Sequence, residues 1–75
     1  NYIIYPNPFF EGITVQRDSG LEAIGYSIAD QFGRIITHGV LADQLTTIPL
    51  QDLPSGIYYP MTSLDKPTYT KLVKL

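Results

Sequence analysis

Apolar and polar residues alternate along most of this chain with the period of β-strands. In 12–17, Ile13 and Val15 point to one face and the polar residues between them to the other, so one face is expected to be buried. No apolar pattern of helical period persists over a helical length. Short segments rich in Ile, Val, Thr and Tyr, separated by Gly and Pro, predict strands at 2–5, 12–17, 24–30, 34–39, 45–50, 57–63 and 69–75.

Turn residues connect these strands. In 30–34, Asp30 suits the first position of a type I turn, and Gly33 suits a left-handed residue that closes a hairpin with a bulge. A second type I turn is predicted at 53–56, and another turn at 64–67. Pro49 lacks a backbone donor, which predicts an edge strand or a strand end.

The number and spacing of the strands predict an all-β fold, an antiparallel β-sandwich of about seven short strands. With 75 residues and no cysteine, the chain is expected to form a single domain, 1–75, that packing alone stabilises. The first residue is Asn1, not methionine, so we expect a domain excised from a larger precursor.

Charge and composition narrow the function. The net charge of −2 gives no basic field for nucleic acid, and no apolar run approaches the roughly 20 residues of a membrane helix. His38 and Asp43 lack the nucleophile elbow of a hydrolase, and 18–22 lacks the ligand spacing of a calcium loop. We therefore predict no catalytic residue, no cofactor and no metal site, and we expect the chain not to be an enzyme.

Aromatic and basic residues leave alternatives open. Six tyrosines could form a sugar-binding platform, but Tyr58 and Tyr59 are adjacent and point to opposite faces of a strand, so packing is favoured. Arg34 could pair with an acidic group of a partner or with Asp30 across its own hairpin, and the pair with Asp30 is favoured. In 71–75, KLVKL, the lysines either protect an edge strand or leave its backbone open to β-augmentation, and the two interpretations are compatible.

Four segments together carry a resemblance to a known family: YPNPF at 5–9, IADQFGRII at 28–36, IPLQDLPSGIYY at 48–59 and KLVKL at 71–75. Their order and spacing resemble the type A C-terminal sorting domain of type IX secretion cargo proteins, the Por secretion system family of Bacteroidetes. The resemblance implies an Ig-like sandwich that directs an upstream cargo domain from the periplasm across the outer membrane to the cell surface or medium. It implies as partners the type IX translocon, shuttle proteins and a surface sortase that removes the domain.

The resemblance also assigns residues. The family motif positions, largely structural, are Tyr5, Pro6, Asn7, Pro8, Phe9, Asp30, Gly33, Arg34, Leu53, Gly56, Ile57 and Tyr58. The candidates for translocon recognition are Lys71, Leu72, Val73, Lys74 and Leu75. The two prolines in 5–9 are expected to keep the backbone extended and to hold the first strand away from the cargo.

One strand departs from the family pattern, because Pro60 and Thr62 stand where alternate apolar residues are usual. Either this strand is bulged with Tyr59 and Met61 turned inward, or its middle pairs on one side only. The alternative function is an Ig-like accessory or carbohydrate-binding module of a secreted enzyme. The isolated domain could also form a weak edge-strand dimer.

Overall fold

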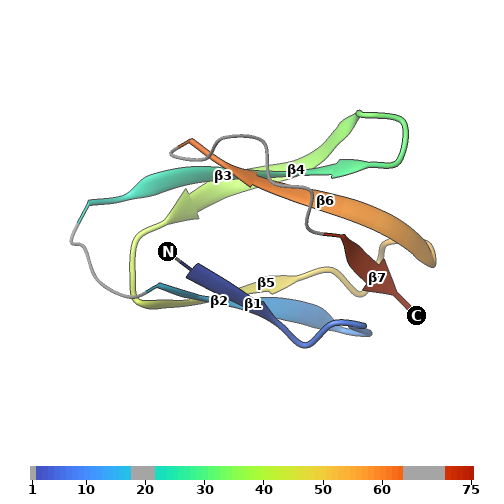
Figure 1. Ribbon diagram of the computed structural model, residues 1–75, viewed down its shortest axis with the longest axis horizontal. Helices are drawn as coiled ribbons and strands as arrows, with labels where there is room; N and C mark the ends of the chain where they lie inside the picture. The colour runs from blue at the N-terminus through green and yellow to red at the C-terminus, as the bar shows by residue number, and fades with distance from the viewer. Residues whose placement is uncertain (1, 18–21, 64–70) are drawn as a thin grey trace.

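The computed structural model describes residues 2–17, 22–63 and 71–75 (Figure 1). These ranges form seven strands: β1 (Tyr2–Tyr5), β2 (Gly12–Arg17), β3 (Ile24–Asp30), β4 (Ile35–Leu41), β5 (Leu45–Pro49), β6 (Gly56–Thr62) and β7 (Leu72–Lys74). They build two facing antiparallel sheets of order β1-β2-β5 and β4-β3-β6-β7. The predicted all-β sandwich is confirmed, and no helix of the described ranges could span a membrane.

The core lies between the sheets and follows the predicted alternation. Ile13 and Val15 of β2 are buried, whereas Gln16 of the same strand is exposed to solvent. Strands β2 to β7 contribute buried residues to one cluster, against which Ile4 of β1 packs, and this burial removes apolar surface from water. That cluster consists of Phe9, Ile13, Val15, Ile24, Ile28, Leu41, Ile48, Leu50, Tyr58 and Leu72.

Strand positions agree with the predictions to within a few residues. The bounds of β1, β2 and β3 are those predicted, and β4, β5 and β6 differ by one or two residues at their ends. Pro49 is the last residue of β5, an edge strand, as predicted. The described part of the last strand is shorter than 69–75, and the turn predicted at 64–67 lies outside the described residues.

Strand β6, which contains Pro60 and Thr62, pairs within the described ranges with β3 alone along its second half. It runs in regular register with β3 from Tyr58 to Thr62, whereas β7 pairs only with the residues up to Tyr58. Pro60 is buried and Met61 is exposed, because Tyr58 and Pro60 alternate inward without interruption. Among the described residues, the one-sided alternative is therefore confirmed, and the bulge with Tyr59 and Met61 turned inward is wrong.

The corner between β5 and β6 differs from its prediction. The hydrogen-bonded turn lies three residues earlier than 53–56, with the Leu53 N–H donating to the Leu50 carbonyl at 3.2 Å. The Tyr58 hydroxyl donates to the Pro54 carbonyl at 2.6 Å and holds the segment after the turn against β6. Immunoglobulin-like sandwiches also contain a tyrosine whose hydroxyl bonds back across a corner.

Arg17 closes the opposite end of the sandwich, a role that the sequence did not reveal. Its side chain is buried, with Nη1 donating to the Leu41 carbonyl at 2.9 Å and Nη2 to the Glu22 carbonyl at 2.8 Å. The guanidinium thereby links β2 of one sheet to β4 of the other. Tyr2, the first residue of β1, pairs with Arg17, so the chain enters the sandwich at this end, called here the Arg17 end.

Candidate functional site: the motif end

The four motif segments meet at the end of the sandwich away from Arg17. Figure 1 shows the segment after β1, the β3–β4 hairpin, the β5–β6 corner and β7 together at the right of the view. Strand pairing joins them, because Gly56 pairs with Lys74 and Asp30 pairs with Tyr58. Segments that lie far apart in the sequence thus form one surface, called here the motif end.

Asn7 and Phe9 cover the outer edge of β7. The Asn7 Nδ2 donates to the Lys71 carbonyl at 2.7 Å, and its Oδ1 accepts the Val73 N–H at 3.0 Å. The Phe9 N–H donates to the Val73 carbonyl at 2.8 Å, and the Phe9 carbonyl accepts the Leu75 N–H at 2.9 Å. These four bonds, called here the clasp, give partners to the backbone groups that an edge strand would otherwise leave exposed.

The clasp changes the interpretation of 71–75. An edge of β7 open to β-augmentation is wrong for this structure, because the clasp already occupies its donors and acceptors. Lys74 also does not protect the edge as an exposed charge. It is 7 % exposed, and its Nζ lies 4.8 Å from the centroid of the Phe10 ring. Leu72 is in the core, which leaves Lys71, Val73 and Leu75 as the exposed recognition candidates.

The backbone of 5–9 is bent, so the predicted extended segment is wrong. The chain bends at Asn7 and Pro8, and the peptide bonds before Pro6 and Pro8 are both cis. A straight continuation of β1 could not bring the Asn7 amide to β7 and also place Phe9, 1 % exposed, between the sheets. The motif therefore redirects the chain from one sheet to the edge of the other.

The β3–β4 hairpin is built around Asp30, as predicted. Its Oδ1 accepts the Phe32 N–H at 2.9 Å and the Arg34 N–H at 3.0 Å, and its Oδ2 accepts Arg34 Nε at 2.9 Å. Gly33 has a φ of 83°, a left-handed conformation that favours glycine. Partial burial opposes ionisation, but the two N–H donors and the guanidinium outweigh it and hold the pKa of Asp30 below its usual value.

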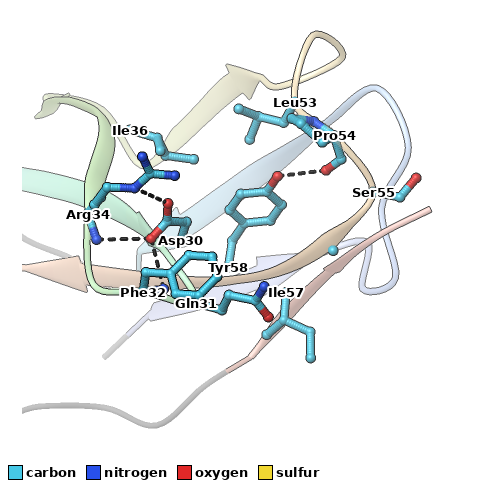
Figure 2. A pocket seen from close by; sticks show the side chains of 11 residues that line it. Asp30, Gln31, Phe32, Arg34, Ile36, Leu53, Pro54, Ser55, Ile57 and Tyr58 are labelled. Atoms are coloured by element: carbon cyan, nitrogen blue, oxygen red, sulfur yellow. Dashed lines mark hydrogen bonds and ion pairs between the residues drawn. The ribbon is translucent and has the colours of Figure 1, made fainter.

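A cavity of about 240 Å³ separates this hairpin from the β5–β6 corner. Figure 2 shows the Tyr58 ring between the Asp30–Arg34 pair and Pro54, to which its hydroxyl bonds. The cavity thus brings together motif residues of two distant segments. Those residues are Asp30, Arg34, Leu53, Gly56, Ile57 and Tyr58.

The cavity combines an apolar wall with a cationic rim. Phe32 is 76 % exposed although it is large and apolar, and the Arg34 guanidinium lies 5.9 Å from the centroid of its ring. Arg34 uses Nε for Asp30, and its Nη atoms bond to no residue in the described ranges. Such an arrangement can accept an apolar side chain that stands beside a carboxylate.

Nearly the whole chain, including the motif end, matches a known protein family. The model of the secretion system C-terminal sorting domain matches residues 3–74. The chain belongs to this family. It is a sorting domain that directs export of a cargo protein by type IX secretion to the cell surface or the extracellular space, and it acts together with that machinery. Searches of curated proteins and of solved structures found no match.

Among the described residues, no group of His, Cys, Asp and Glu side chains could hold a metal ion. Tyr58 is buried and its hydroxyl is bonded to Pro54, so this tyrosine offers no free face to a sugar. His38 is exposed on β4. Sequence reasoning missed the role of Asn7, although an amide can donate and accept at once and stands here between two prolines.

Proposed function

We propose that the sorting domain works as a folded, non-catalytic docking module whose motif end binds the type IX translocon and its shuttle proteins. It travels through the periplasm behind its cargo, and a surface sortase then removes it. The single observation that carries the proposal is the assembly of four motif segments into one surface that exposes Phe32 and Arg34.

The position of the first strand supports this arrangement. A cargo domain joined upstream would connect to β1 at Tyr2, which pairs with Arg17 at the opposite end of the sandwich. The motif end therefore faces away from the attachment point. A bulky cargo would not obstruct the docking surface.

The test is secretion of a fluorescent reporter that has an export signal at its front and residues 1–75 at its back. The host is a bacterium with or without a working type IX translocon. We expect reporter at the surface or in the medium only with the translocon, and the mass of the exported reporter should show loss of the domain. Retention of a folded fusion in the periplasm of both hosts would contradict the proposal.

Two substitutions test the motif end itself. Phe32→Ser removes an exposed aromatic side chain beside the cavity, and Leu45→Ser is its matched control, since Leu45 is also exposed but pairs with Gln16 toward the Arg17 end. We expect Phe32→Ser to lower secretion and Leu45→Ser to leave it unchanged, with both variants folded. Equal secretion would move the docking surface away from the motif end.

A further inference from the structure

The two sheets have four outer edges, and three of them carry features that discourage strand addition. β1 has four residues and is followed by Pro6 and Pro8. β5 ends on Pro49, and β7 has three residues, follows the exposed Lys71 and is covered by the clasp. Short strands, prolines, lysines and covering segments are the usual protection of sheet edges.

β4 has none of these features. It is seven residues long and contains no proline and no Asp, Glu, Lys or Arg. It is the terminal strand of its sheet, and within the described ranges no segment pairs with its outer side. Ile35 and Val40 are exposed on it. Apolar side chains on a long unpaired strand are a template for another strand.

The backbone groups on this edge follow from the pairing pattern. The Gly25 carbonyl accepts the Ser63 N–H, so Gly25 and its alternate residues on β3 bond toward β6. Their partners on β4, Val40 opposite Gly25 and His38 opposite Ser27, therefore form the non-bonded pairs of an antiparallel ladder. The N–H and C=O groups of His38 and Val40 point away from the sheet.

The bulge in β4 does not protect this part of the strand. The register shifts between Ile28 and Ala29, close to the hairpin, whereas the pairs from Ile28 with Thr37 to Ile24 with Leu41 are regular. Five consecutive residues thus present an undistorted edge. A bulge guards an edge only where it bends the strand away.

We propose that the outer edge of β4 receives an extended strand from a protein of the type IX machinery. The partner segment is uncharged over the paired stretch and has apolar side chains at alternate positions, next to Val40. Backbone hydrogen bonds to His38 and Val40 supply affinity, and the alternate side chains supply selectivity.

The location of β4 favours the machinery over a second copy of the chain. Ile36, near the start of β4, lines the cavity at the motif end together with Arg34. One partner can therefore occupy the cavity and continue along the strand. The inference rests on the proposed docking function and adds to it where and how the partner binds.

Proline substitution tests the edge through its backbone. His38→Pro removes a donor that points outward, so the fold tolerates it while an added strand loses a hydrogen bond and meets the ring. Thr47→Pro is the matched control. The Arg17 N–H donates to the Gln44 carbonyl, so Gln44 bonds toward β2 and Thr47, three residues on, points its backbone groups outward from β5.

Secretion of the reporter with residues 1–75 is measured for both variants, together with their thermal unfolding. We expect His38→Pro to lower secretion at least about tenfold, a change of about 1.4 kcal/mol, and Thr47→Pro to stay within about twofold of the unchanged domain. Equal secretion of the two overturns the inference and leaves the docking function intact. Failure of the unchanged domain to reach the surface overturns the docking function itself.

Two further measurements keep the outcome decisive. If His38→Pro does not fold, Val40→Lys replaces it, with Leu45→Lys as control, since these side chains are 57 % and 58 % exposed on β4 and β5. Sedimentation of the isolated domain tests a second copy as the occupant. A dimer that His38→Pro dissociates, with secretion unchanged, overturns the assignment to the machinery.

Discussion

The two outer strands of the four-stranded sheet, β7 and β4, differ in whether the backbone groups on their outer sides have hydrogen-bond partners. β7 has three residues, and Asn7 and Phe9 bond to its exposed backbone groups. β4 has seven uncharged residues, and within the described ranges no segment pairs with its outer side. Within the described ranges, the YPNPF motif and the terminal strand therefore complete the fold together, whereas the unpaired edge belongs to β4, which is part of neither.

The largest effect is expected from breaking the closed edge at its buried residue. Phe9→Ala removes a ring that is 1 % exposed, and such truncations cost about 3–5 kcal/mol of the typical 5–15 kcal/mol of a domain. Urea unfolding measures the loss. Phe10→Ala is the control, because its neighbouring ring is 65 % exposed, and its effect should stay below about 1 kcal/mol. Equal losses would contradict the role given to Phe9.

A smaller effect is expected from opening the clasp at Asn7. Asn7→Ala removes two hydrogen bonds, each worth about 0.5–1.5 kcal/mol, and Asn7→Asp keeps only the acceptor for the Val73 N–H. Hydrogen exchange shows the result directly, because the Val73 amide should then exchange as fast as the outward His38 amide. An unchanged Val73 amide in Asn7→Ala would show that the edge is closed by other means.

The smallest expected effect is a difference in acid sensitivity between the hairpin that precedes β4 and the clasp on β7. Asp30 holds the hairpin before β4 as a carboxylate whose pKa is lowered, so its contribution is present above the unfolded pKa of about 3.9 and is lost as the pH falls through the folded value. Acid should therefore reduce amide protection at Phe32 and Arg34 before it affects Val73, whose partner is a neutral amide.

Asp30→Asn should remove this part of the acid dependence while it keeps an oxygen that accepts the two backbone N–H groups. Thermal unfolding between about pH 6 and about pH 3 measures the difference from the unchanged domain. The same acid dependence in both proteins would show that other carboxylates dominate.

Local patterns predicted the strands best where one face is buried and the other is wet. The alternation in β2 specified both its bounds and its inward residues, because a slip of one residue would expose the whole apolar set. The hairpin at 30–34 was also predicted from the sequence, since Asp30 and Gly33 lie three residues apart and form the turn together. Short-range chemistry was sufficient there.

Contacts between residues far apart in the sequence could not be predicted from local patterns. Asn7 bonds to β7 across 64 and 66 residues, and no local window contains both partners. The burial of Arg17 depends on two carbonyls that only the folded sandwich brings near it. The turn residues of 53–56 do not form the hydrogen-bonded turn, which lies at 50–53, and the bond from Tyr58 to the Pro54 carbonyl was not visible in the local sequence.

The clasp also determines when the export signal can exist. Its partners are 64 and 66 residues apart, and a chain synthesised from its N-terminus delivers 71–75 after all the other described residues. Until those residues arrive, the core lacks Leu72 and the Asn7 amide has no strand to hold. The motif end is thus assembled only after residues 71–75 have joined the fold, so the docking surface forms later than the hairpins that precede it in the sequence.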